Sequence, residues 1–300
     1  MTYEEVFGIR DNPFCPNKPY EGVSPFLMAK LSSLPLQIHK APRLKDLFSE
    51  DAGPFRDAIQ DFQSLLQGYG YDPPGVGTES FVFLIRGPQG TGKTTLALWM
   101  VDWLASCLPP PGRWKIYDDW IHKDFVSAEA QASAFLALRD RILQETSETD
   151  YICVLLDNLL GGAEQQALNL YGDLFEKRVV AIFLITSDHV LLNKNWDNAR
   201  FSPHAIYQTE DLSADNAVHY IRDRMKVFRA HGGNSPADLL YPFREDDIRS
   251  SLETGADETG RIVTLRQLNI TLCNALREGV KLGPPGPPIS LVQAYQRLVA

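Results

Sequence analysis

The sequence has few cysteines and no regular spacing among them. Its 300 residues include four, and no pair has the Cys-x-x-Cys spacing; six histidines are scattered and form no His-Glu-x-x-His motif. The cysteines and histidines therefore indicate neither a metal site of their own nor a redox motif. Cys107, Cys153 and Cys273 have apolar neighbours, and we expect them to be free thiols that pack as small hydrophobic side chains.

Long apolar runs and net positive charge are lacking too. The longest apolar runs, such as Val179–Ile185, are much shorter than the ~18–20 residues that a membrane span requires. The first residues are acidic, whereas a signal peptide begins with a basic and then an apolar segment. A net charge of −9 disfavours nucleic acid as a partner, although an oligomer could still gather a local basic patch. We expect a cytoplasmic protein with no membrane association.

What is present is an ordinary globular composition. Hydrophobic residues make up 44% of the chain and charged residues 22%, which excludes a disordered or collagen-like protein. A chain of 300 residues is long enough to bury a large core and predicts about two domains.

From residue 81 onward, short apolar runs alternate with helical patterns. Such runs are typical of a parallel sheet that is covered by helices on both faces. We predict strands at Phe81–Arg86, Trp114–Tyr117, Tyr151–Asp157, Val179–Thr186 and Ala205–Thr209. We predict the intervening helices at Thr94–Cys107, Ala128–Glu145 and Ala163–Glu176.

The chain divides into three parts on this basis. Residues 1–53 are rich in proline and predict a mostly irregular arm, and residues 54–210 predict the α/β core with one helix before its first strand. Residues 211–300 predict a small all-helical domain. Its helices are expected from Ser213 to about Arg229, and at Glu245–Glu253, Thr264–Arg277 and Ile289–Val299, the last after a Pro/Gly spacer.

One motif carries a specific chemical signal. The run Gly87-Pro88-Gln89-Gly90-Thr91-Gly92-Lys93-Thr94 matches G-x-x-x-x-G-K-[ST], and it lies between a predicted strand and a predicted helix. Glycines let backbone N–H groups surround phosphate oxygens at a helix N-terminus. Lys93 would contact the β- and γ-phosphates and the Thr94 hydroxyl would ligate Mg²⁺. We predict that this run, with Thr95 after it, binds ATP and Mg²⁺.

A second metal ligand is expected at the end of another buried strand. Asp157 follows the apolar run Tyr151–Leu156, where a carboxylate would ligate Mg²⁺. The next position, where a glutamate commonly polarises the attacking water, is Asn158. An amide can orient water but accepts no proton, so we expect slow hydrolysis. Asp118 and Asp119, after the second predicted strand, are the alternative candidates for a base, although solvated loop acids explain them better.

Polar residues also follow the fourth predicted strand, as Thr186 and Ser187. If that strand lies between those of the phosphate loop and Asp157, one of these side chains lies near the γ-phosphate. Without that topology, a helix-capping role for Ser187 explains it equally well.

Taken together, these features resemble those of an AAA+ ATPase over roughly residues 55–280. The segments 7–14 (Phe-Gly-Ile-Arg-Asp-Asn-Pro-Phe) and 211–224 are similar to the opening motif and the first lid helix of a compact bacterial group. That group includes transposition ATPases of the TniB type and ExeA-like secretion ATPases, with origin-recognition ATPases more distant.

The resemblance implies further roles. Ser187, or Thr186, would be the sensor 1 residue. Arg266 would be the sensor 2 arginine that contacts the γ-phosphate, with Arg261 as the alternative, and Arg200 would be an arginine finger for a neighbouring subunit's nucleotide. Each of these arginines could instead be an ordinary surface charge.

Three functions remain open on the sequence. The first is a slow ATP-binding regulator whose nucleotide state, ATP or ADP, controls assembly with itself or with a partner protein. The second is a DNA-associated ATPase of the transposition or replication-initiation type, and the third is a scaffold that binds ATP without hydrolysing it.

Overall fold

The computed structural model describes residues 1–9, 12–14, 55–72, 77, 79–107, 114–117, 125–160, 163, 166–167, 174, 179–187, 203–209, 212–229, 240–253, 262, 264–283 and 288–299. The chain separates into two compact units. The α/β unit comprises Asp57–Gln89 and Lys93–Glu210. The helical unit comprises Met1–Arg56, Gly90–Gly92 and Asp211–Ala300.

A five-stranded parallel sheet forms the centre of the α/β unit. Its order is β2-β3-β4-β1-β5, so that β4 lies between β1 and β3. The strands are β1 (Phe81–Arg86), β2 (Trp114–Tyr117), β3 (Tyr151–Leu159), β4 (Val180–Thr186) and β5 (Ala205–Gln208). The predicted parallel α/β sheet is confirmed.

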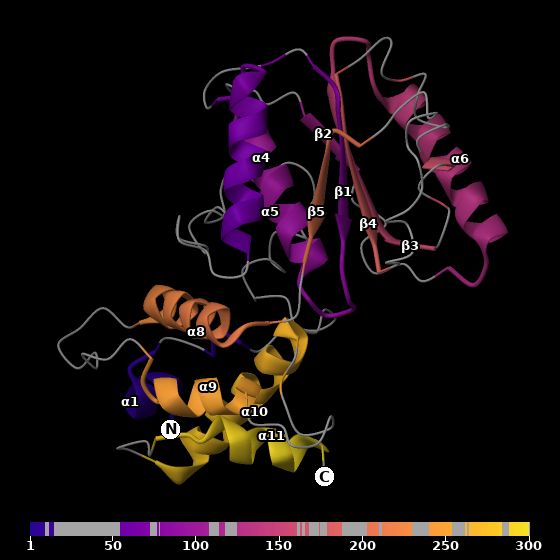
Figure 1. Ribbon diagram of the computed structural model, residues 1–300. Coiled ribbons are helices and arrows are strands. Elements are labelled where there is room, and N and C mark those ends of the chain that lie inside the picture. The colour runs from indigo at the N-terminus through magenta and orange to yellow at the C-terminus, as the bar shows by residue number, and fades with distance from the viewer. Residues whose placement is uncertain are drawn as a thin grey trace. The chain divides into compact units, whose positions relative to one another are not determined.

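Helices cover both faces of this sheet, as Figure 1 shows. α4 (Arg56–Gly68) and α5 (Lys93–Ser106) lie on one side, and α6 (Ala128–Glu145) lies on the other. On the first side, the ring centroid of Phe62 lies 5.2 Å from that of Phe83 and 5.7 Å from that of Trp103. On the second side, aliphatic residues of β1, β3 and β4 pack against the apolar stripe of α6, namely Phe135, Leu138 and Ile142. Burial on both faces explains why these strands are apolar throughout.

The edge strand β5 is preceded by a histidine, His204, that bonds to β1. The Nδ1 atom of His204 accepts a hydrogen bond from the Val82 N–H at 3.0 Å, and the His204 N–H donates to the Val82 carbonyl at 2.8 Å. Burial lowers the pKa of His204, and the nearby Glu79 opposes this shift only partly. The folded chain therefore favours the neutral ring, which alone can accept the Val82 hydrogen bond.

This histidine predicts a pH-dependent stability. The pKa of His204 in the folded chain lies below the unfolded value near 6.5. The contribution of His204 to the free energy of unfolding is therefore fully present above about pH 6.5 and is lost as the pH falls further. We expect His204→Asn, which keeps an acceptor but does not titrate, to flatten the fall in unfolding free energy between pH 7.5 and 5.5. Denaturant unfolding at both pH values measures this. His219→Asn, on an exposed position of α8, is the control, and an equal flattening there would contradict the assignment.

The helical unit consists of five described helices, each beginning where the sequence supplies a cap or a turn. They are α1 (Tyr3–Phe7), α8 (Ala214–Phe228), α9 (Glu245–Glu253), α10 (Leu265–Leu282) and α11 (Leu291–Val299). Ser213 caps α8, and Thr264 forms a capping box with Gln267 at the start of α10. Within the described part of the chain, no helix combines the length and the apolar character that crossing a membrane requires.

α1 was not predicted, because the first 53 residues were expected to be mostly irregular. Its five residues are stabilised at both ends: Thr2 and Glu5 form a reciprocal capping box, and Gly8 ends the helix with a φ of +65°. Such short helices depend on caps and on packing rather than on an apolar repeat. The predicted helix at 163–176 lies largely outside the described residues.

Residues 7–9 and 12–14 contribute to the core of the helical unit. Phe7, Ile9 and Phe14 are buried. Two buried arginines of this unit bind the same segment through its backbone: Arg229 donates to the Phe7 carbonyl and Arg224 to the Pro13 carbonyl, both at 2.9 Å. The segment is thus an integral part of this unit.

α10 extends five residues beyond its predicted end at Arg277. Its later part contains Gly279, where a Cβ atom would lie 2.5 Å from the Phe7 ring. The glycine is therefore a point of close packing inside the helix and does not end it.

The cysteines behave in two ways. Cys107 and Cys153 are buried free thiols as predicted, and burial raises the pKa of Cys107 to about 12, which makes it unreactive. The expectation for Cys273 was wrong, because this cysteine is disulfide-bonded. Spacing in the sequence could not reveal this bond, since pairing depends on which segments meet in the fold.

Candidate nucleotide-binding site

The glycine-rich run joins the end of β1 to the start of α5. Its first residue, Gly87, has no room for a side chain: a Cβ atom would lie 2.1 Å from Oγ1 of Thr209. Thr209 is held there because its N–H and hydroxyl both donate to the Arg86 carbonyl. Gly90 and Gly92 have φ values of +87° and +94°, which favour glycine. The loop's backbone path therefore requires glycine.

Lys93 is the first residue of α5, and its side chain curls over the loop. It is only 8% exposed, and its ammonium group donates to the carbonyls of Gly87 at 2.9 Å and Pro88 at 2.7 Å. The positive charge thus lies within the concave side of the loop, beside the first turn of a helix. This is an arrangement suited to an anion.

Thr94 and Asp157 come together across the sheet. The Thr94 hydroxyl donates to Oδ2 of Asp157 at 2.8 Å, and Asp157 is 7% exposed. A hydroxyl and a buried carboxylate in contact form an oxygen donor set of the kind that Mg²⁺ prefers. The residues present therefore fit a magnesium ion. Thr95, the next residue of α5, is half-buried.

Asn158 has an unusual conformation. Its φ is +58°, in the left-handed region that few residues other than glycine adopt, and its side chain is exposed. Its N–H donates to Oδ1 of the preceding Asp157 at 2.8 Å. Both carboxylate oxygens of Asp157 are thereby engaged.

The end of β4 lies beside this carboxylate, between β1 and β3. The topology on which a sensor role for this strand end depends is therefore present. Thr186 is fully buried and its hydroxyl donates to the Leu159 carbonyl at 3.3 Å, whereas Ser187, the next residue, is exposed. Of the two candidates, Ser187 is the one at the surface of the unit.

Of the remaining predicted site residues, the structure describes Arg266. In the helical unit, the Arg266 N–H donates to the Gly90 carbonyl at 3.0 Å, and the Arg266 side chain is exposed. Arg200, Arg261, Asp118 and Asp119 lie outside the described residues.

Sequence reasoning missed Gln131, which contacts the Asp157 strand from α6. Its side chain is fully buried and bonds to the backbone on both sides of Leu159. A signal was available: Gln131 lies on the helical repeat of Phe135, Leu138 and Ile142, and a glutamine in a buried apolar stripe needs a polar partner.

Comparisons with known proteins find this fold and no near relative. No family model matches the chain, and no curated protein matches it. Among solved structures, the Orc2 protein of Aeropyrum pernix in its ADP form superposes with a TM-score of 0.54 at 15% identity, covering 97% of this chain and 73% of that one. Cdc6p of Pyrobaculum aerophilum gives a TM-score of 0.49 at 16% identity, over 85% and 71%.

The likeness to Orc2 confirms the predicted fold: a parallel α/β sheet covered by helices, with a glycine-rich loop after its first strand, accompanied by a helical unit. At these identities the likeness shows the fold alone. The narrower likeness to the TniB and ExeA-like group stays a prediction.

Proposed function

We propose that this chain is an AAA+ ATPase that binds Mg-ATP, hydrolyses it slowly, and uses its nucleotide state to control assembly with itself or with a partner protein. The observation that supports this most directly is the contact between Thr94 and Asp157, with the Lys93 ammonium group inside the adjoining loop. These are the groups that a triphosphate and its metal require, at the start of the helix after β1 and near the end of β3, where an AAA+ ATPase would carry them.

Each group has a distinct task in this proposal. Backbone N–H groups of residues 87–92 and the N-terminus of α5 hold the phosphates, and Lys93 neutralises the β- and γ-oxygens. Thr94 and Asp157 would hold Mg²⁺, which supplies charge neutralisation between the same phosphates. Ser187 and Arg266 would respond to the γ-phosphate. Asn158 would orient water without taking its proton, and slow turnover follows from that.

Assembly is tested by the mass of the particle. We expect static light scattering to give a mass near 33.7 kDa without nucleotide and at least twice that with Mg-ATP, or with Mg-ATP and a co-purified partner. Lys93→Ala should remain at the lower mass under both conditions. An unchanged mass for the native chain, with ATP shown to be bound, would leave nucleotide binding standing and remove the assembly role.

Arg200 provides a test of action between subunits. A finger arginine stabilises charge on a neighbour's nucleotide in the transition state, so it acts in trans. We expect Arg200→Ala and Lys93→Ala each to abolish hydrolysis, and a mixture of the two to recover part of it, measured as phosphate release. Absence of recovery in particles shown to contain both variants would count against Arg200 as a finger.

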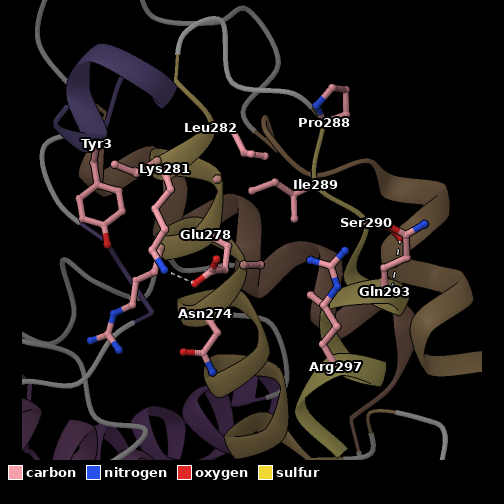
Figure 2. Close-up of a pocket in the computed structure, with 15 residues that line it drawn as sticks. Tyr3, Asn274, Glu278, Lys281, Leu282, Pro288, Ile289, Ser290, Gln293 and Arg297 are labelled. Carbon is pink, nitrogen blue, oxygen red and sulfur yellow. Dashed lines mark hydrogen bonds and ion pairs between the residues drawn. The ribbon is translucent and has the colours of Figure 1, made fainter. Parts of the chain in front are cut away.

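A second candidate function is a DNA-associated ATPase. The observation that favours it is a groove of about 800 Å³ in the helical unit, between α10 and α11 (Figure 2). Three cations line it, Arg277, Lys281 and Arg297, against one acid, Glu278, which pairs with Lys281 at 2.6 Å. This is a local excess of positive charge on a chain whose net charge is −9.

DNA binding by this groove would weaken steeply with salt, because phosphate contacts release counterions. Fluorescence anisotropy with a labelled duplex at 50 and 200 mM salt, for the native chain and for Arg277→Ala with Arg297→Ala, separates this candidate from the first. A third possibility, a scaffold that never hydrolyses ATP, is distinguished by single-turnover assays.

A further inference from the structure

The end of β3 contains an irregularity next to the proposed metal ligand. The register with β4 runs Leu156↔Leu184 and then Leu159↔Thr186, so β3 has one residue more than its neighbour over this step. The extra residue falls at the Asp157–Asn158 pair. Asn158 is the one non-glycine residue with positive φ in the described part of the chain. The feature is a β-bulge with a left-handed residue, of the kind found beside functional sites.

A bulge removes backbone groups from the sheet's hydrogen-bond ladder, and buried groups of this kind need other partners. Gln131 of α6 supplies them. Its Nε2 donates to the Asn158 carbonyl at 3.3 Å, and its Oε1 accepts from the Leu160 N–H at 3.0 Å. One side-chain amide thus bonds on both sides of Leu159. Gln131 is 0% exposed, so its amide is shielded from bulk water.

The conformation held by Gln131 determines what Asp157 can do. The Asn158 N–H points back to Oδ1 of Asp157 only because the chain turns at this residue. That bond orients the carboxylate, and its other oxygen, Oδ2, meets the Thr94 hydroxyl. If the bulge relaxed into a regular strand, the Asn158 N–H would turn toward the ladder and the carboxylate would lose this constraint.

We infer that Gln131 is a positioning residue for the magnesium site: it holds the bulge at Asn158 and thereby orients Asp157 toward Thr94. The inference rests on the proposed Mg-ATP binding. It also gives a second reason for asparagine at position 158, because asparagine tolerates a left-handed backbone better than glutamate does.

The test is the Mg²⁺-dependent part of ATP affinity. We would measure the dissociation constant of ATP by calorimetry in Mg²⁺ and in EDTA for Gln131→Met, which keeps the length of the side chain but neither hydrogen bond. We expect Mg-ATP to bind roughly 10- to 100-fold more weakly, a typical cost of losing a group that orients a metal ligand. Affinity in EDTA should change less than about twofold, because the loop and Lys93 are unaltered. Ser133→Ala, an exposed position on the same helix, should match the native chain.

A second variant makes the inference specific to the bulge. Glycine adopts positive φ without strain, so Gln131→Met combined with Asn158→Gly should keep the turn without the amide and recover at least half of the lost affinity on a logarithmic scale. If Gln131→Met fails to fold by circular dichroism, Gln131→Glu takes its place. That variant keeps an oxygen to accept from the Leu160 N–H but loses the N–H that donates to the Asn158 carbonyl. We therefore expect a loss of Mg-ATP affinity smaller than that of Gln131→Met.

The outcomes separate the inference from the proposed function. A native chain that binds no Mg-ATP overturns both. A native chain that binds Mg-ATP, with Gln131→Met weakening ATP equally in Mg²⁺ and in EDTA or leaving both unchanged, overturns the inference alone. So does a double variant that recovers nothing.

Discussion

Replacing Lys93 with alanine should weaken Mg-ATP binding at least about 100-fold. The ammonium group would make charge-assisted hydrogen bonds to two phosphates, each contributing roughly 1.5–3 kcal/mol. Alanine keeps the helix start and removes the charge, together with the bonds of the ammonium group to the Gly87 and Pro88 carbonyls. Isothermal calorimetry with Mg-ATP measures the loss, and the circular dichroism spectrum should remain native.

The control for this result is another lysine of the same unit. Lys115 pairs with Asp150 at 2.9 Å at the surface, and Lys115→Ala should leave ATP affinity within about twofold of native because exposed pairs contribute little. Thr94→Ala should lose the Mg²⁺-dependent part of binding while keeping affinity in EDTA. Native ATP affinity in Lys93→Ala would remove the nucleotide-binding assignment altogether.

Replacing Asn158 with glutamate should raise the turnover number, by up to about 100-fold, with little change in ATP affinity. A carboxylate can accept the proton of the attacking water, and such general-base help is typically worth 10²–10⁴ in rate. We expect a gain at the lower end of that range, because glutamate at a φ of +58° adds backbone strain of about 1 kcal/mol. Phosphate release at saturating ATP gives the rate, and thermal unfolding should show a small destabilisation.

Asn158→Gly is the matched variant for the backbone. It keeps the left-handed turn and removes the amide, so turnover should fall modestly as water loses its orientation, without loss of stability. If the native chain already hydrolyses ATP faster than Asn158→Glu does, the base comes from elsewhere. Asp118 and Asp119 would then be the first positions to replace.

Much of this architecture could be predicted because the signals are local. The loop motif is eight consecutive residues between a strand and a helix. The central strands β1, β3 and β4 are built on apolar runs, and their burial on both faces requires that composition. Helix starts at Ser213 and Thr264 follow from capping chemistry within four residues. Of the strands, β1 and β2 have the predicted bounds, and β3 is longer by the two residues that enter the bulge.

The candidate site could be predicted only as a set of residues. Lys93, Thr94 and Asp157 follow from motif and strand position, but the contact between Thr94 and Asp157 depends on how the sheet brings the ends of β1 and β3 to one edge, with β4 between them. Strand order is a property of the whole sheet and is not written in any one segment. The same strand order pairs Thr186 with Leu159, and the Thr186 hydroxyl donates to the Leu159 carbonyl. Ser187, the next residue, is exposed.

What the sequence by itself determined, then, is chemistry that lies within a few neighbouring residues: the phosphate loop, the acid after a buried strand, the caps and the apolar runs. Only the tertiary structure decided what depends on contacts between distant segments. Gly87 must be glycine because of Thr209, Gln131 bonds to the backbone on both sides of Leu159, and Arg229 and Arg224 donate to the carbonyls of Phe7 and Pro13. The physical reason is that a buried polar group takes whichever partner the fold brings to it, and sequence spacing does not specify that partner.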